Sequence, residues 1–266
     1  QKISRQTDQS LGISDKETFA EDENYLITAY KRNTDLKKTM GMTNSTVNPI
    51  GIFKANNTRY IITDCIEGKN YCEECDSNIH TVFVRMLALA KILREYHKKG
   101  FLHLDIKPSN ILVIPETAEH IYLFDFDSLQ LKSDIRSGNV KRLSFSNGFS
   151  VPELIHGKYG ELCDATDFYS IGAIVYVKLF GTMPSFTDFS ISYQPDFSSE
   201  KFKDQDPDLL KKLTRFFRKT LTPSVLSRFG SDDELITALD ELADLSGLER
   251  PYLIDSFTYI SGYFVG

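Results

Sequence analysis

The sequence predicts an α+β fold in which a small region built from a helix and a few strands precedes a larger, mainly helical region. Short apolar runs separated by turn residues occur between residues 49 and 124, a pattern typical of strands joined by tight connections. After residue 153 the apolar positions recur mostly at helical spacing. No internal repeat is present.

We expect the N-terminal region to contain one amphipathic helix and a hairpin. Residues 1 to about 17 give no assignable pattern, but apolar positions over residues 18–36 follow helical spacing. Residues 49–53 and 60–63 are short apolar, β-prone runs, and the Asn56-Asn57 pair between them is typical of a turn. These two runs therefore predict an antiparallel pair of strands.

The centre of the chain predicts a helix followed by two short strands. Residues 81–97 carry apolar side chains along one helical face. Lys98-Lys99-Gly100 suits the end of that helix, because cations favour the negative end of the dipole and glycine accepts a left-handed cap. Residues 111–114 and 121–124 read as strands on either side of a turn at 115–117.

Two helices are predicted in the C-terminal half. Residues 168–180 are apolar nearly all round, which indicates a core helix that Gly181 can cap. Residues 231–234 read Ser-Asp-Asp-Glu, a capping box in front of the apolar positions from Leu235 onward.

Composition narrows the class of protein. The chain has 266 residues, of which 41% are hydrophobic and 26% charged, and its net charge of −6 gives no general reason to bind nucleic acid or anionic membrane. The longest apolar run, 171–180, is too short to span a bilayer, and no signal-peptide pattern is visible. Four cysteines in this length do not form a disulfide framework. We therefore expect a cytoplasmic protein with reduced thiols.

Cys72 and Cys75 have CxxC spacing. A zinc site needs a second pair of ligands, and a redox motif needs a thioredoxin-like context; neither is visible in the sequence. We interpret both cysteines as ordinary thiols in a loop or short helix.

Residues 103–110, His-Leu-Asp-Ile-Lys-Pro-Ser-Asn, place an acid, a lysine and an amide at fixed offsets, and Asp125-Phe126-Asp127 follows an apolar run. Phosphoryl transfer from ATP requires a carboxylate for the hydroxyl proton, a cation, and oxygen ligands for Mg²⁺. Asp105 and Lys107 can meet the first two needs, and Asn110 and Asp125 the third. Each residue type is common in polar loops, but their combination with His103 and the flanking apolar runs argues against chance.

These two segments resemble the catalytic loop and the metal-binding loop of the protein kinase family. The resemblance implies a bilobal fold whose small lobe is incomplete in this sequence, ATP and Mg²⁺ as cofactors, and a protein substrate. It also implies that His103 and Phe126 support the catalytic residues.

Further positions match the same family in the same order. Val151-Pro152-Glu153 resembles its Ala-Pro-Glu segment, and Arg228 matches the arginine that pairs with that glutamate. Asp167 resembles the aspartate that braces the backbone of the catalytic loop from a large buried helix. Taken alone, Asp167 and Arg228 would be interpreted as an N-cap and a surface charge.

Residues 60–68 are similar to the last small-lobe strand and hinge of protein kinases. The match implies that Thr63 lies beside the adenine pocket, that the backbone of Asp64 and Ile66 bonds adenine, and that Leu112 forms the floor. A plain edge strand is the alternative.

The small lobe departs from the family pattern because no Gly-x-Gly occurs in the sequence. By the order of family elements the glycine-rich loop would precede Gln1, so we expect either a truncated chain or an incomplete, inactive relative. Lys2 is the candidate for the lysine that holds the phosphates, and Glu23 is its candidate helix partner. Both could equally be solvated surface charges.

Further comparisons with the family concern the hydroxyl group that accepts the phosphate and the regulation of activity. Lys107 and Ser146 match serine/threonine kinases, and we expect the Ser146 hydroxyl to bond both Asp105 and Lys107. Leu104 replaces the arginine that pairs with a phosphorylated activation loop, so such phosphorylation is not expected to be the switch. Asp127 replaces a glycine, which predicts a metal loop biased toward one conformation.

We divide the chain into a partial small lobe (1–66), a large lobe (67–248) and a tail or linker (249–266). Residues 262–266 resemble the opening of signalling ATPase domains, which suggests a bacterial kinase domain of a larger signalling protein with a further domain beyond Gly266; a plain apolar tail is the alternative. The leading hypothesis is a serine/threonine protein kinase. The alternatives are a pseudokinase acting as a nucleotide-binding or interaction module and, less favoured, a small-molecule kinase.

Overall fold

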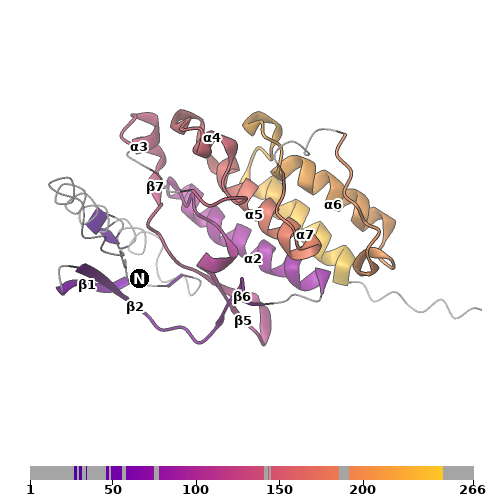
Figure 1. The fold of residues 1–266 in the computed structure, drawn as a ribbon, viewed down its shortest axis with the longest axis horizontal. Coiled ribbons are helices and arrows are strands. Elements are labelled where there is room, and N and C mark those ends of the chain that lie inside the picture. The colour runs from indigo at the N-terminus through magenta and orange to yellow at the C-terminus, as the bar shows by residue number, and fades with distance from the viewer. Residues whose placement is uncertain are drawn as a thin grey trace, which may run out of the picture.

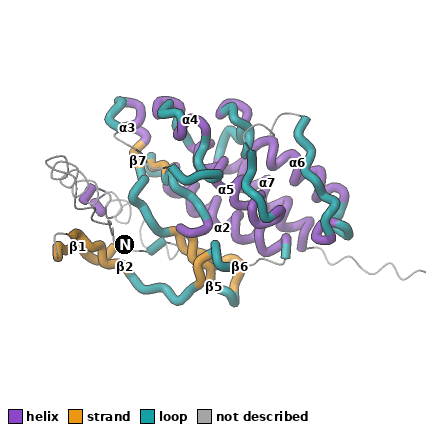
Figure 2. The backbone as a smooth tube through the Cα atoms, in the orientation of Figure 1, coloured by secondary structure: helices purple, strands orange, loops and turns teal. Residues whose placement is uncertain are grey.

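The computed structural model describes residues 27–28, 30–31, 34, 46–47, 49–55, 58–74, 78–140, 143, 145–185 and 192–247. Figure 1 shows the long helices packed together on one side of the molecule and the β1–β2 hairpin on the other. Figure 2 shows by secondary structure that the β1–β2 hairpin stands apart from the helices, whereas β6 lies beside α2. The predicted division into a small stranded part and a larger helical part is therefore observed.

The predicted hairpin is confirmed. Strands β1 (Pro49–Ala55) and β2 (Thr58–Thr63) pair antiparallel, and the rings of the facing Phe53 and Tyr60 stack with centroids 5.0 Å apart. Of the helix predicted over 18–36, the described residues 27, 28, 30, 31 and 34 are helical.

Two small sheets frame the central loops. Strands β3 (Lys69–Asn70), β5 (Ile111–Ile114) and β6 (Thr117–Leu123) form an antiparallel sheet in the order β3-β5-β6. Strand β6 begins earlier than predicted, because Thr117 already pairs with Ile114 and confines the turn to residues 115–116. Strands β4 (Phe101–Leu102) and β7 (Gln130–Leu131) pair antiparallel and bring the two ends of segment 101–131 together.

In the part of the chain that the structure describes, four long helices make the larger part: α2 (Ile79–Lys98), α5 (Asp164–Phe180), α6 (Pro207–Thr220) and α7 (Asp232–Gly247). Helix α2 packs against α7 and α5, and α6 packs against α5 and α7. The short helices α3 (Lys132–Arg136) and α4 (Pro152–Ile155) lie along one edge of this block (Figure 1). Single 3₁₀ turns occur at η1 (Pro108–Asn110), η2 (Tyr159–Glu161), η3 (Glu200–Phe202) and η4 (Val225–Ser227).

Caps explain where helices depart from the predicted bounds. Helix α5 begins at Asp164 rather than 168, because the Cys163 N–H donates to Thr166 Oγ1 at 3.1 Å in a capping box. Gly181 caps its end in the predicted left-handed conformation, with φ of 72°. In front of α7, Glu234 N–H donates to Ser231 Oγ at 3.3 Å, whereas the Glu234 carboxylate accepts from the N–H of Gly230 at 3.0 Å. The reciprocal bond of this capping box is therefore shifted by one residue.

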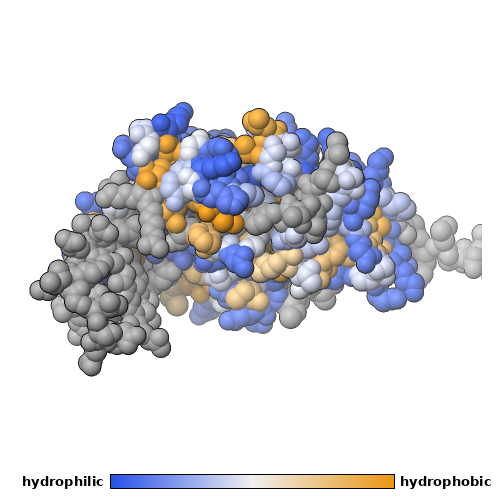
Figure 3. All heavy atoms as spheres, turned by 45° about the horizontal axis from the view of Figure 1, so that its top comes forward, coloured by the Kyte–Doolittle hydropathy of each residue, from blue (hydrophilic) through white to orange (hydrophobic). Residues whose placement is uncertain are grey.

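Helix α5 is the centre of the core, as its apolar sequence predicted. Its side chains from 165 to 175 are buried on all faces. The described surface shown in Figure 3 is mostly hydrophilic, with apolar residues gathered in small areas. Within the described residues, no helix is long and apolar enough to cross a membrane.

Candidate active site

The loop after β4 is held in place by one buried carboxylate. Asp167 on α5 accepts the N–H of His103 at 2.8 Å through Oδ2 and the N–H of Leu104 at 2.9 Å through Oδ1. Leu104 has φ of 65°, a left-handed conformation that costs a non-glycine residue about 1–3 kcal/mol. The two bonds from Asp167 offset this cost and direct the chain toward Asp105, so the predicted brace is present.

Asp105, Lys107 and Ser146 form a closed triangle of hydrogen bonds. Lys107 Nζ donates to Asp105 Oδ2 at 2.8 Å and to Ser146 Oγ at 3.0 Å. The Ser146 hydroxyl donates to Asp105 Oδ1 at 2.7 Å, and both contacts expected for Ser146 are therefore formed. The Ser146 N–H also donates to Ser150 Oγ at 2.8 Å, which fixes this segment locally.

Asn110 joins the same cluster from the 3₁₀ turn η1. Its Nδ2 donates to the Asp105 carbonyl at 2.9 Å and to Asp105 Oδ2 at 3.2 Å. Both bonds use the amide nitrogen, which leaves Oδ1 as the atom that can bind a cation. Phe124 N–H donates to the Asn110 carbonyl at 3.1 Å, and Asp125 follows directly. An amide oxygen and a carboxylate from neighbouring segments fit the preference of Mg²⁺ for hard oxygen ligands.

The segment Asp125-Phe126-Asp127 is anchored by its central aromatic ring. Phe126 is buried, with its ring parallel to that of Tyr96 at 5.9 Å and tilted against His103 at 5.5 Å. Asp125 has φ of 64°, and it and Leu104 are the described non-glycine residues with positive φ. The left-handed conformation therefore falls on Asp125, and Asp127 occupies the family's glycine position without needing glycine's freedom.

Negative charge accumulates at this segment. Burial, and then the nearby carboxylates of Asp125 and Asp105, raise the pKa of Asp127 to about 6. Burial lowers the pKa of His103, so that histidine is neutral here and adds no cation. A divalent cation bound between Asn110 and Asp125 would relieve this repulsion.

The predicted nucleotide residues meet around one cavity of about 420 Å³ between β2, the 63–66 segment and the start of the metal loop. Its lining includes Thr63, Asp64, Ile66, Leu112 and Asp125. Sequence reasoning missed further lining residues, which share no motif: Tyr30, Val47, Pro49, Ile61 and Phe124. Lys2 and Glu23 lie outside the described residues.

A second hollow of about 490 Å³ is lined in part by Lys107 and shares no lining residue with the first cavity. Apolar side chains form much of its wall, namely Pro108, Phe149, Val177 and Met183. A larger hollow of about 640 Å³ against α6 contains none of the residues of the Asp105 cluster. Chemistry, rather than size, therefore makes the Asp105 cluster the candidate active site.

The predicted ion pair between Glu153 and Arg228 is formed. Arg228 donates to both carboxylate oxygens of Glu153, at 2.6 and 3.0 Å, and both side chains are buried. Glu153 belongs to α4, which follows the segment that carries Ser146. The pair thus anchors the segment that follows Ser146 to the helical core.

Comparison with known proteins identifies the same family that the sequence motifs resemble. A family model described as a protein kinase domain matches residues 13–237. The chain is 24% identical over 203 residues, 74% of its length, to 29% of a probable serine/threonine-protein kinase of Clostridium perfringens. It is 26% identical over 181 residues (66% of its length) to 27% of another from Clostridium acetobutylicum. Over 133 residues (47% of its length) it is 32% identical to 7% of smooth muscle myosin light chain kinase of Gallus gallus. The chain spans less than a third of the length of these relatives.

Proposed function

The chain belongs to the protein kinase family, and from this premise we propose that it transfers the γ-phosphoryl group of ATP to a serine or threonine hydroxyl of a protein. The observation that carries the proposal is the triangle of Asp105, Lys107 and Ser146. Lys107 of this triangle lines a hollow that could receive a second substrate, and a separate cavity is lined by the proposed nucleotide residues. The relatives named as serine/threonine kinases support the choice of acceptor.

Each residue of the cluster has a role in this reaction. Asp105 accepts the proton of the acceptor hydroxyl, and the bonds from Lys107 and Asn110 fix its carboxylate in one orientation. Lys107 offsets the negative charge that develops during transfer. Asn110 and Asp125 would hold Mg²⁺, which when bound neutralises charge on the phosphates.

The adenine ring of ATP would bind in the cavity beside β2. We propose that Thr63 borders the adenine, that the backbone of Asp64 and Ile66 bonds it, and that Leu112 supports its face. Lys2 and Glu23 are retained as the proposed phosphate-binding pair. Because ATP would be the donor, the cytoplasm is the compartment that we propose.

A polypeptide fits the acceptor side better than a metabolite. The hollow beside Lys107 is lined by Phe149 and Met183 and shares no residue with the nucleotide cavity, so it can receive a side chain next to the acceptor residue. The buried pair of Glu153 and Arg228 anchors the segment that forms this wall. A small-molecule kinase is therefore the weaker alternative.

A pseudokinase is the second candidate, favoured by the lack of any Gly-x-Gly in the sequence. Such a protein would bind nucleotide through the same cavity but would not transfer phosphate. The presence of Asp105, Lys107, Asn110 and Asp125 in one cluster favours catalysis.

The test compares wild type with Asp105→Asn and Asp125→Asn in phosphate transfer from labelled ATP to a mixture of proteins and, separately, of metabolites. We expect Asp105→Asn to lose activity by about 100-fold or more, since general-base catalysis contributes 10²–10⁴-fold. Asp125→Asn should also lose activity, because it removes the charge of a proposed Mg²⁺ ligand. Asp105→Asn should still bind ATP with Mg²⁺ in calorimetry, whereas Asp125→Asn should bind it weakly. Asp240→Asn, an exposed change on α7, is the matched control.

Three outcomes separate the candidates. Activity that survives both Asp105→Asn and Asp125→Asn would refute the assignment. Wild-type protein that binds ATP with Mg²⁺ but phosphorylates nothing would indicate the pseudokinase. Labelling of metabolites in preference to proteins would indicate the small-molecule kinase.

A further inference from the structure

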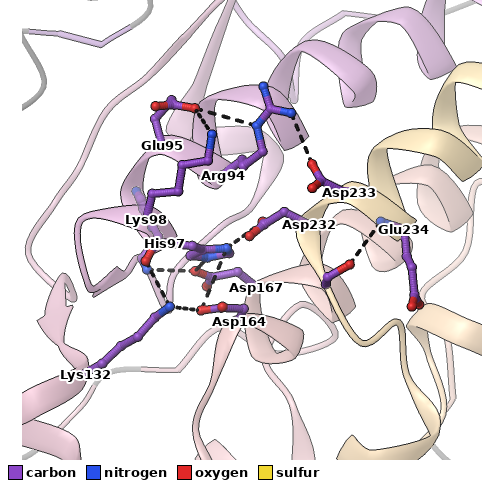
Figure 4. A network of polar contacts seen from close by, with 12 residues as sticks. Arg94, Glu95, His97, Lys98, Lys132, Asp164, Asp167, Asp232, Asp233 and Glu234 are labelled. Atoms are coloured by element: carbon purple, nitrogen blue, oxygen red, sulfur yellow. Dashed lines mark hydrogen bonds and ion pairs between the residues drawn. The ribbon is translucent and has the colours of Figure 1, made fainter.

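A buried histidine connects α7 to the carboxylate that holds the catalytic loop. His97 lies in the last turn of α2 with a fully enclosed ring. Its Nε2 is 3.0 Å from Asp167 Oδ2, and its Nδ1 is 2.7 Å from Asp232 Oδ1. Figure 4 shows the imidazole between these two carboxylates, which come from α5 and α7. Sequence reasoning missed His97, which belongs to no motif.

The geometry determines the charge of this ring. Carboxylates only accept hydrogen bonds, and a neutral imidazole has a single N–H. With both carboxyl groups ionised, two short contacts require hydrogen on both ring nitrogens, which makes His97 an imidazolium. Burial opposes this charge, but the hydrogen bonds and charges of Asp167 and Asp232 outweigh it and raise the pKa of His97 to about 9.

The charge of His97 matters because Asp167 is itself buried. Burial opposes ionisation of Asp167, yet the bond and charge of His97, helped by the His103 backbone, keep the pKa of this carboxyl below its ordinary value. An ionised Asp167 is the group that holds Leu104 in its left-handed conformation. The contacts thus run without a gap from Asp232 through His97 and Asp167 to the residue before Asp105.

Asp232, rather than Asp164, is the carboxylate that pairs with His97 together with Asp167, because the other nearby charges have partners of their own. Asp164 Oδ1 is 3.9 Å from His97 Nδ1, but Lys132 of α3 pairs with Asp164 and also donates to the His97 carbonyl at 3.0 Å. On the outer side, Arg94 binds Asp233 at 3.2 Å. The remaining charges on α2 nearby, Lys98 and Glu95, bind each other at 3.1 Å (Figure 4).

The same three ligand types could in principle hold a metal ion, since ligand atoms of His97, Asp164 and Asp232 lie within 4.8 Å of one another. An imidazolium has no lone pair to offer, however, and Asp164 already has a lysine partner. The cluster is therefore an ion-pair network.

We propose that Asp232 is a positioning residue for phosphoryl transfer, acting through His97 and Asp167 on the backbone that carries Asp105. It touches neither substrate nor the reacting atoms. The expected change in kcat rests on the proposed function. The expected changes in His97 titration and Leu104 amide exchange rest on the geometry alone. The start of α7, which contributes no residue to the nucleotide cavity, would thereby control the catalytic loop.

The test uses the full chain with Asp232→Asn, which keeps the shape and an acceptor oxygen but removes the charge. We expect the pKa of His97, followed by NMR of its ring, to fall by about one unit or more. Amide exchange at Leu104 should accelerate, and kcat should fall about tenfold with the KM for ATP unchanged. The high-pH limit of activity should move to lower pH with the His97 titration.

Two matched variants separate positioning from a general loss of structure. Asp232→Glu keeps the charge and should restore the His97 titration and Leu104 exchange toward wild type. Asp233→Asn removes the adjacent, exposed carboxylate and should leave both unchanged.

The inference is overturned if Asp232→Asn leaves the His97 titration and Leu104 exchange at their wild-type values, or if Asp233→Asn has the same effect. Should Asp232→Asn not fold, failure of Asp232→Glu to fold as well would also overturn it. If the wild-type chain phosphorylates nothing, the proposed function fails, while the titration and exchange measurements still decide the role of Asp232.

Discussion

The guanidinium of Arg228 binds Glu153 through two parallel hydrogen bonds of 2.6 and 3.0 Å in the interior of the larger lobe. The arginine is satisfied on its other side by the carbonyls of Thr222 and Pro223, at 3.0 and 3.1 Å, and lies over the ring of Tyr169 at 5.4 Å. Its charge is therefore fully compensated without solvent. Such a pair tolerates joint removal better than loss of one partner.

We predict that Arg228→Ala lowers the free energy of unfolding by about 3–5 kcal/mol, because Glu153 would remain as an uncompensated buried charge. Replacing both residues by methionine should cost less than the single change, since no buried charge is left. Urea unfolding of the variants measures both. A single-variant loss below about 1 kcal/mol would mean that water reaches Glu153.

The parts of the site that could be predicted were those carried by local sequence. Asp105, Lys107 and Asn110 share one loop, so their spacing alone implies convergence, and Ser146 could be added through its matched position. His97 and Asp232 are 135 residues apart, and nothing local in either segment indicates that they meet. Distant pairs of this kind depend on how α2 and α7 pack.

The elements of the fold also divide into those that local sequence predicts and those that depend on tertiary contacts. Residues 81–97 and 49–63 carry clear periodicity, and both elements are observed there. Strands β4 and β7 have two residues each and exist only because tertiary structure places them side by side. The start of α5 was predicted late because Cys163 is an uncommon capping residue.

Gly172 of α5 lies directly against Thr220 of α6. A Cβ at this position would lie 2.2 Å from Thr220 Oγ1, so the helices would have to separate. We predict that Gly172→Ala lowers the free energy of unfolding by about 1–3 kcal/mol through overpacking, despite the better helix propensity of alanine. Gly160→Ala, where a Cβ meets nothing within 4 Å, is the matched control and should be nearly neutral. Equal effects at both positions would contradict the packing argument.

Charge around the hollow beside Lys107 predicts which substrates it accepts. Glu74 is engaged by Arg85 at 3.1 Å, and Lys178 donates to the Tyr71 and Glu74 carbonyls at 2.6 Å each. Apolar wall and positive charge therefore dominate, and we expect peptides with a basic side chain next to the acceptor to react poorly.

Met183→Glu should reverse that preference, because it places a carboxylate on the wall of the hollow. We expect the ratio of basic to apolar peptides phosphorylated in a positional library to rise several-fold, as about 1 kcal/mol corresponds to a fivefold change. Leu226→Glu, an exposed change on η4 outside this hollow, should leave the ratio unchanged. An unaltered ratio in Met183→Glu would show that substrate side chains do not enter the hollow.

The imidazolium of His97 predicts how stability depends on pH. Its pKa is about 9 in the folded chain and about 6.5 in the unfolded chain, so the folded state binds the proton more tightly. The stabilisation is complete below about pH 6.5, declines as pH rises, and is lost above about pH 9. The total is roughly 3 kcal/mol, from the difference between the two pKa values.

Unfolding by urea at pH 6, 7.5 and 9 in wild type and His97→Gln measures this contribution. We expect the difference between the two proteins to shrink steadily as pH rises, since glutamine has no proton to lose. His156→Gln, an exposed histidine in the same lobe, should differ from wild type by a small amount that does not vary in this way. A constant difference between wild type and His97→Gln would mean that His97 is neutral in the folded chain, and that one of its two carboxylate partners carries the proton instead.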